Sequence, residues 1–294
     1  MTLRQRLPNL VIGGAILVGV FAWAYWPTLV EFARTWVREP DYSHGFLVLP
    51  LALFFLWARR DRFPGLADRL AWPGVALILL SLGMRIFSAW VYVDAVDGWS
   101  LLVWTAGVVW LFGGARVLWW SLPSIAFLWF MVPLPWRLER MASLPLQRVA
   151  TKLSCWTLQS LGQPALAEGN TILLGEHRLE VEQACSGLAI FLGVIALAFA
   201  YVILVRRPWW ERALLLISVV PISLIANATR IVVTGLLYQT VSGDAGYKFS
   251  HDIAGLVMIP YAAGLFALVL WYLGKLMREV QVADVSDVLR PDRV

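Results

Sequence analysis

Residues 178–190 read RLEVEQACSGLAI and contain the sharpest change of pattern in the chain. In the first half, apolar and polar residues alternate as in a half-buried strand, with Leu179 and Val181 on one face. After Gly187 the residues are continuously apolar, as in a membrane helix. The change of pattern predicts an extended segment that leads directly into a membrane helix, with Cys185 at the helix start.

The position of Cys185 favours a reactive thiol. A helix N-terminus carries partial positive charge and unpaired N–H groups, and both stabilise a thiolate relative to a thiol. Ser186 can cap the helix, and Gly187 leaves room for another backbone to approach. A cysteine at this position can equally be a small, inert core residue, so position alone leaves both interpretations open.

The composition is that of a membrane protein. The chain has 294 residues, of which 60% are hydrophobic and 17 are tryptophan. Several apolar runs are long enough to cross the hydrocarbon core of a bilayer. The net charge of +5 is expected to mark cytoplasmic loops and contacts with membrane lipids, and we expect no nucleic-acid partner.

We therefore predict an all-α polytopic membrane protein with about eight transmembrane helices, in a single integral membrane domain over 1–277. Polar segments at 31–45 and 94–98 are expected to separate neighbouring helices, and 278–294 to form a disordered cytoplasmic tail. A cleaved signal peptide is the alternative for the first run, but that run continues past the small-residue motif at 22–24. The expected helices cover about 10–30, 46–58, 70–93, 99–112, 117–132, 185–205, 213–238 and 251–274.

The segment from about 136 to 184 has a different pattern and is expected to form a cap on the outer face of the membrane. Basic and apolar residues are interleaved at helical spacing over 136–163, as in an amphipathic helix on a membrane surface. Residues 170–183 then have the pattern of a short β-hairpin with its turn at Gly175-Glu176.

The short loops predict the orientation of the helices. The loops at 59–69 and 206–212 and the turn at Arg116 are basic, whereas the short loops on the opposite side contain acidic residues. By the positive-inside rule, both termini lie in the cytoplasm. We expect the protein in the inner membrane of a bacterial cell. Cys185 and His251 then lie on the outer, periplasmic side.

Arg230 is the second informative residue, because it lies inside the seventh apolar run. A guanidinium at membrane depth costs at least about 2.5–3.5 kcal/mol on insertion scales, so it is expected to face a partner or a wet cavity. Asn227 lies three residues earlier and projects from the same helix face. The topology brings the Cys185 thiol, the Arg230 guanidinium and the His251 imidazole to one depth. The alternatives are a structural ion pair for Arg230 and a head-group contact for His251.

A Cys, His and Arg cluster suits acyl transfer. A thiolate can attack a peptide carbonyl and form a thioester. An imidazole can give a proton to the leaving amine and later take one from the acceptor. A guanidinium can stabilise the oxyanion of the tetrahedral intermediate or hold the substrate backbone in register.

Three motifs together resemble the exosortase/archaeosortase family: ACSG at 184–187, NATR at 227–230, and His251 at the head of the last helix. The likeness extends from DYSHG at 41–45 to about Met277. The resemblance implies a membrane cysteine transpeptidase or endopeptidase that uses no cofactor and no metal. Its substrates would be exported proteins with a C-terminal sorting signal of the Pro-Glu-Pro type. The acceptor is unknown, with a glycan or a lipid as candidates.

The resemblance implies catalytic roles for Cys185 as nucleophile, His251 as general acid and base, and Arg230 as the group that stabilises the oxyanion or the substrate. We expect the extended segment before Cys185 to hold a substrate peptide by strand addition. Substrate-binding or supporting roles are expected for the nearby polar and small residues Asn227, Ser186, Gly187, His44 and Glu182.

Three other functions remain open from the sequence. The three histidines and a thiolate suit a metal site, although no two are spaced as a local ligand pair. A transporter could use Arg230 to bind an anionic substrate, but the sequence has no inverted repeat. A thiol-redox protein could use Cys155 and Cys185, although Cys155 has only Lys152 nearby as an activating group.

Overall fold

The computed structural model describes residues 3–39, 42–67, 69–175, 177–181, 187–205, 207–241 and 254–276. Several residues singled out from the sequence lie outside these ranges: Glu182, Cys185, Ser186, His251 and the 278–294 tail.

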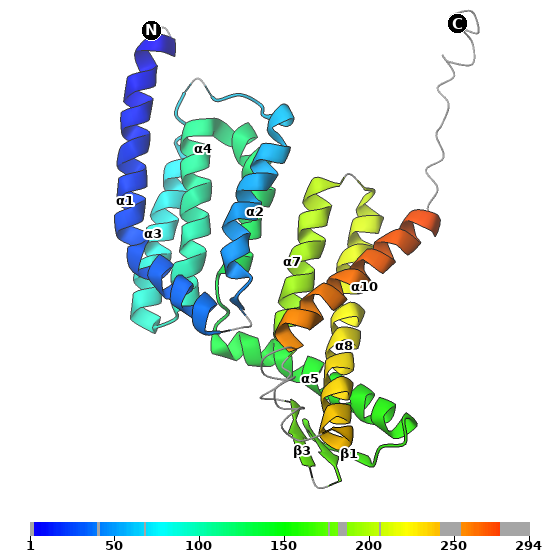
Figure 1. The fold of residues 1–294 in the computed structure, drawn as a ribbon. Coiled ribbons are helices and arrows are strands. Elements are labelled where there is room, and N and C mark those ends of the chain that lie inside the picture. The colour runs from blue at the N-terminus through cyan, green and yellow to red at the C-terminus, as the bar shows by residue number, and fades with distance from the viewer. Residues whose placement is uncertain are drawn as a thin grey trace, which may run out of the picture.

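Helices form most of the described chain. In order they are α1 (Leu3–Arg38), α2 (Gly45–Ala58), η2 (Arg60–Arg62), α3 (Pro73–Val91), α4 (Asp94–Phe127), η3 (Leu128–Met131), α5 (Trp136–Ser160), α7 (Leu188–Leu204), α8 (Trp209–Thr240) and α10 (Ala254–Leu276). In Figure 1, α1 to α4 stand side by side as one group, and α7, α8 and α10 form a second group. Helix α5 runs across the lower ends of both groups, with the strands beneath it (Figure 1).

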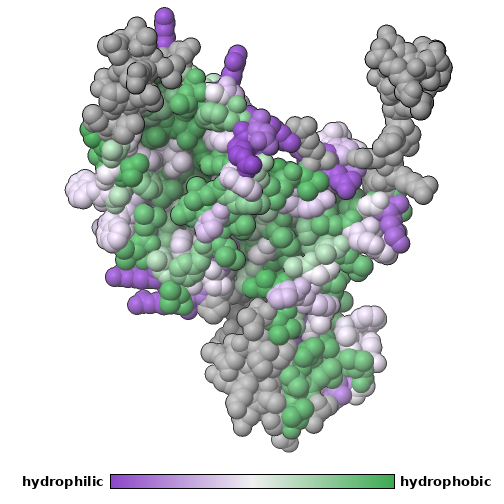
Figure 2. Space-filling view, turned by 45° about the horizontal axis from the view of Figure 1, so that its top comes forward, coloured by the Kyte–Doolittle hydropathy of each residue, from purple (hydrophilic) through white to green (hydrophobic). Residues whose placement is uncertain are grey.

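The helical part has the surface of a membrane protein. Five described helical segments are long and apolar enough to cross a membrane, and α2 and α7 are shorter apolar helices. Figure 2 shows broad hydrophobic areas on the outside of the molecule, with hydrophilic residues in smaller patches. The predicted count of eight crossings is not confirmed, since α4 and η3 form one long apolar segment and α2 and α7 are shorter than the other five segments.

Gly114 divides α4 into two arms. Its φ of 79° and ψ of 175° are not helical, so the chain turns there. A left-handed φ of this kind is readily available only to glycine. The turn falls within the GGAR segment at 113–116, where the sequence predicted a turn between two helices.

Two polar segments that were expected to be loops are helical instead. Helix α1 continues to Arg38, because Phe32 is buried and Trp36 packs beside it while the charged residues face outward. Helix α4 begins at Asp94, so the predicted turn at 94–98 is wrong. Asp94 and Asp97 lie in its first turn, where carboxylates stabilise a helix by facing its positive end.

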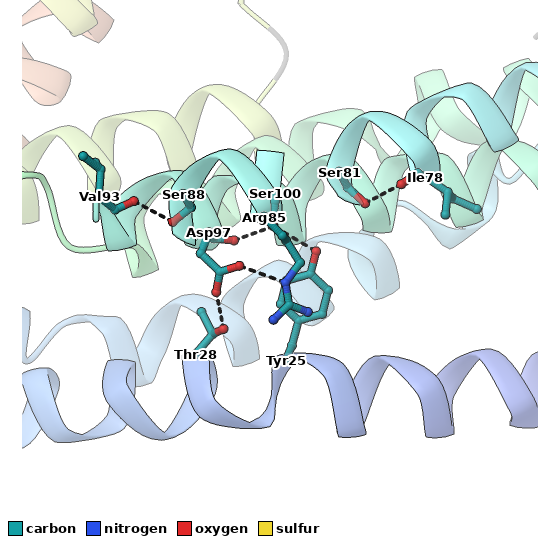
Figure 3. A network of polar contacts seen from close by, with 9 residues as sticks. All are labelled: Tyr25, Thr28, Ile78, Ser81, Arg85, Ser88, Val93, Asp97 and Ser100. Atoms are coloured by element: carbon teal, nitrogen blue, oxygen red, sulfur yellow. Dashed lines mark hydrogen bonds and ion pairs between the residues drawn. The ribbon is translucent and has the colours of Figure 1, made fainter. Parts of the chain in front are cut away.

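A network of polar side chains joins α1, α3 and α4 (Figure 3). Arg85 Nε lies 2.9 Å from Asp97 Oδ1, and the Thr28 hydroxyl donates to the other oxygen of the same carboxylate. The Arg85 guanidinium also lies 4.2 Å from the centre of the Tyr25 ring. The Tyr25 and Ser100 hydroxyls are 2.9 Å apart. These contacts satisfy polar groups within an apolar bundle, where an unpaired group is costly.

The cap contains a helix and a small antiparallel sheet. The strands β1 (Ala165–Glu168), β2 (Thr171–Leu174) and β3 (His177–Glu180) pair in the order β1-β2-β3. The predicted hairpin is confirmed as β2 and β3, and β1 was not predicted. The buried side chains of the sheet pack with residues of α5 and α8 in one core: Ala150, Cys155, Leu158, Ala165, Ile172, Leu174, Leu179, Val181, Ile231 and Val232.

Candidate active site

Gly187 packs against α8 just before α7 begins. It is buried and has a φ of +68°, a conformation that L side chains rarely adopt. A Cβ atom placed on Gly187 would lie 2.8 Å from Asn227 Nδ2. Gly187 is therefore required both by its backbone conformation and by the closeness of Asn227. The contact joins two predicted site residues and fixes the chain two positions after Cys185 against α8.

A narrow crevice lies beside this contact. It is lined by Leu146 from α5, Gly187, and three α8 residues, Ser223, Leu224 and Asn227. The Ser223 hydroxyl is buried, with no hydrogen-bond partner in the described part of the chain. The start of α7, the middle of α8 and helix α5 thus meet at one point, with polar atoms at their contact.

The α8 segment from Asn227 to Arg230 contacts several elements at once. Ser154 Oγ of α5 donates to the Ala228 carbonyl over 3.3 Å. The hydroxyls of Thr229 and Tyr261 of α10 are 3.5 Å apart. Arg230 is half-buried and lies one helical turn beyond Asn227, and both side chains have interaction partners within the chain. The predicted Asn227 and Arg230 pair therefore lies where α5, α7, α8 and α10 come together.

His44 lies at the start of α2. Its Nε2 is 3.1 Å from the Phe130 carbonyl oxygen of η3. Nearby, Trp36 Nε1 donates to the Met131 carbonyl at 3.0 Å, and the Leu134 N–H donates to the Tyr42 hydroxyl at 3.3 Å. His44 therefore helps to hold the start of α2 against η3, and its supporting role in the active site stays a prediction.

Three glutamine side chains, which the sequence reasoning did not single out, attach the sheet to the helices. Gln147 of α5 accepts from Asn170 Nδ2 at 2.9 Å. Gln159 donates to the Ala165 carbonyl at 2.8 Å, and Gln239 of α8 donates to the Leu174 carbonyl at 2.7 Å. Gln147 is the buried one of the three, and a buried amide on a helix face was the available signal because it needs a partner.

The structure bears on the competing thiol and metal interpretations through Cys155 and the acidic and histidine side chains. Cys155 is buried on α5 and accepts a hydrogen bond from Gln159 Nε2 at 3.7 Å, so it belongs to the core of the cap. Among the described residues, no group of three or more His, Cys, Asp or Glu side chains could hold a metal ion. Cys185 and His251 are outside that search.

A comparison with family models gives one match. The model described as transmembrane exosortase matches residues 36–282. The chain belongs to the transmembrane exosortase family. The resemblance predicted from the three sequence motifs is thus confirmed at the level of the family. An exosortase of this kind is a multi-pass membrane protein, and its family implies a membrane transpeptidase or protease. Neither the curated proteins nor the solved structures gave a significant match.

The Gly187 contact leads to a prediction about stability. We expect Gly187→Ala to lower the thermal midpoint of the exosortase, because alanine adds a Cβ against Asn227 and pays about 1–2 kcal/mol for a left-handed backbone. Gly193→Ala, within α7 and with nothing within 4 Å of its Cβ position, is the control and should keep or slightly raise the midpoint, because alanine favours a helix over glycine. In the double variant Gly187→Ala/Asn227→Ala, the thermal midpoint should regain only the part of the loss that came from the clash with Asn227. Equal midpoints for the two single variants would contradict the assignment.

Proposed function

We propose that this exosortase is a membrane-embedded cysteine transpeptidase or endopeptidase. It cleaves the C-terminal sorting signal of exported proteins through a thioester on Cys185 and transfers the product to an acceptor. The observation that carries the proposal is the Gly187–Asn227 contact, which attaches the chain next to Cys185 to the helix that carries Arg230. The family match supports the reaction class.

The proposed chemistry assigns one task to each of three side chains. The Cys185 thiolate attacks the carbonyl carbon of the scissile peptide bond, and His251 protonates the nitrogen that leaves as an amine. The acyl group then remains on sulfur as a thioester. His251 next takes a proton from the acceptor, whose oxygen or nitrogen attacks the thioester and releases the thiolate. Arg230 stabilises the oxyanion in both tetrahedral intermediates.

The helix geometry supports a role for Arg230 close to the membrane surface. Arg230 is 21 residues after Trp209, the first residue of α8, so it lies about 31 Å along the helix. That distance is close to the thickness of the hydrocarbon core, which is about 30 Å. If Trp209 and Trp210 mark the inner interface, as exposed tryptophans commonly do, Arg230 lies at the outer one.

The same reasoning supports eight crossings. Gly114 divides α4 into two arms, and α2 and α7 add two apolar helices to the remaining long ones. The basic loop between α2 and α3 and Arg207 before α8 then lie in the cytoplasm, with both termini. The Cys185 side faces the periplasm of a bacterial inner membrane.

A topology reporter tests this arrangement. A reporter fused after Met277 should be active in the cytoplasm, and one inserted after Gln163, between α5 and β1, should be active in the periplasm. Both fusions reporting the same side would exclude the proposed orientation.

The strand register supports strand addition as the mode of substrate binding. The Val181 N–H donates to the Asn170 carbonyl at 3.0 Å, which makes residues 170 and 181 a hydrogen-bonded pair. In an antiparallel ladder such pairs alternate, so His177 and Leu179 also direct their backbone groups to β2. Arg178 and Glu180 direct theirs to the opposite edge, where no described strand is paired. The strand with this edge ends five residues before Cys185 in the sequence. An unpaired strand edge of this kind can bind an extended peptide.

Substitutions at position 178 distinguish a role of the Arg178 backbone N–H in substrate binding from a role of its side chain. Arg178→Pro removes an edge-facing N–H without removing one from the β2 ladder, so we expect substrate KM to rise about two- to tenfold with the thermal midpoint retained. Arg178→Ala should keep the wild-type KM. Leu179→Pro removes a ladder N–H and should lower the thermal midpoint instead. An unchanged KM in Arg178→Pro would rule out strand addition at this edge.

The decisive experiment for the function is to trap the intermediate. The full chain is incubated with a membrane-anchored substrate that carries a C-terminal sorting signal, and mass spectrometry should find an acyl adduct on the peptide with Cys185. Cys185→Ala should abolish cleavage at unchanged protein level. Cys155→Ala should be nearly silent, because Cys155 is in the core of the cap. An inactive Cys155→Ala with an active Cys185→Ala would show that the wrong thiol was chosen.

Arg230→Lys distinguishes catalysis from a structural charge. Lysine keeps the positive charge but lacks the planar fork of donors, so an oxyanion role predicts a loss of about a hundred- to thousandfold in kcat. The variant is compared with wild type at equal membrane abundance and equal thermal midpoint. Alkylation of Cys185 by a small reagent should continue in the variant. Substantial turnover by Arg230→Lys would reduce Arg230 to a structural residue.

A further inference from the structure

Helix α5 presents three different faces, and only one of them is used by the described fold. The buried face consists of small, polar and apolar residues that contact α8 and the sheet: Ser143, Gln147, Ala150, Thr151, Ser154, Cys155 and Leu158. Most of the other residues of the helix are exposed. Figure 1 shows this helix lying across the ends of the membrane-spanning helices.

The second face is basic. Arg137, Arg148 and Lys152 are exposed and share one side of the helix, because spacings of eleven and four residues correspond to about three turns and one turn. None of the three forms an ion pair with a carboxylate in the described part of the chain. Three cations that line up over four turns without a protein partner form a surface complementary to anions.

The third face is apolar and lies beside the basic one. Leu138, Val149 and Leu153 each directly follow one of the three basic residues, so they repeat the same spacing one position further round the helix. Their exposed fractions are 46%, 49% and 36%, and Trp156 on the same side is 67% exposed. Such a stripe is unfavourable in water, and its neighbouring cations exclude a purely hydrocarbon environment.

Adjacent apolar and basic stripes are what a helix in the plane of a membrane interface requires. The apolar stripe enters the boundary between head groups and acyl chains, and the cations reach the phosphates. Tryptophan is enriched at this level of the membrane. The exposed Trp136 and Trp156, near the two ends of α5, agree with this placement. Charge complementarity therefore selects an anionic head group among the occupants that an exposed helix face could accept.

We propose that the exposed face of α5 binds anionic phospholipids of the outer leaflet, with Arg137, Arg148 and Lys152 contacting the head-group phosphates. The buried face of the same helix holds the sheet through Gln147 and carries the Ser154 bond to α8. Lipid binding therefore positions the cap over the site. The contact with anionic lipid does not depend on the proposed function, whereas its place in the outer leaflet and its effect on turnover rest on it.

The test measures lipid binding directly in the full-length protein. Wild type and the R137Q/R148Q/K152Q variant are placed in nanodiscs of mixed phosphatidylglycerol and phosphatidylcholine. Native mass spectrometry then counts the lipids retained by each protein. We expect wild type to retain phosphatidylglycerol preferentially, and the variant to lose about fivefold in that preference per removed charge.

R137K/R148K/K152R is the matched control, since it keeps three positive charges at the same positions of the helix. It should keep the lipid preference of wild type at an equal thermal midpoint. If R137Q/R148Q/K152Q retains phosphatidylglycerol as wild type does, the proposal is overturned. If that variant also lost turnover in neutral detergent, the basic face would belong to an acidic substrate segment. If the glutamine variant loses phosphatidylglycerol as expected but wild type shows no turnover, the lipid contact is supported and the proposed function is contradicted.

Discussion

The contact between Gly187 and Asn227 is the constraint on which the site depends. A polar side chain of α8 occupies the volume that any other residue at position 187 would need, and the backbone there is left-handed. Two independent steric conditions thus fix how the chain enters α7. Because α8 also carries Arg230, the packing of α8 against Gly187 fixes the start of α7 relative to the helix of Arg230.

Polar contacts elsewhere serve the same purpose of fixing apolar elements relative to one another. Dispersion and small-residue packing hold membrane helices together, but they specify register weakly. Asp97 gives a single register to three helices, because it contacts both Arg85 and Thr28. The glutamine bonds to Ala165 and Leu174 do the same for the sheet on α5 and α8. Most of the packed side chains are apolar, and the few polar pairs fix the register between the helices and strands that they join.

The sequence predicted the features that depend on local residue patterns. Apolar runs located the helices, the alternation around Leu173 and Leu179 located the hairpin, and the motif at 113–116 located a turn. Strand β1 was missed because ALAE at 165–168 is short and has no clear alternation. The helical extension to Arg38 was missed because charged residues were assigned to a loop.

Contacts between distant segments were harder to predict. The pairing of Arg85 with Asp97 was not predicted, because it depends on how α3 packs against α4. Gly187 and Asn227 were both named from the sequence, yet only the fold shows that they touch. The convergence of Cys185 and His251 with Arg230 remains a prediction.

Helix α8 has 32 residues and is therefore about 48 Å long, which exceeds the hydrocarbon thickness of a typical bilayer by more than half. Its far end holds the sheet through Gln239, and its middle holds the start of α7 through Asn227. Both contacts lie in the part of α8 after Pro221, so one continuous stretch of helix separates them. Hydrophobic mismatch acts on such a helix by tilting it. A thicker or thinner membrane would consequently raise or lower the sheet and the guanidinium together, so the spacing between them is insulated from the lipid composition that surrounds them.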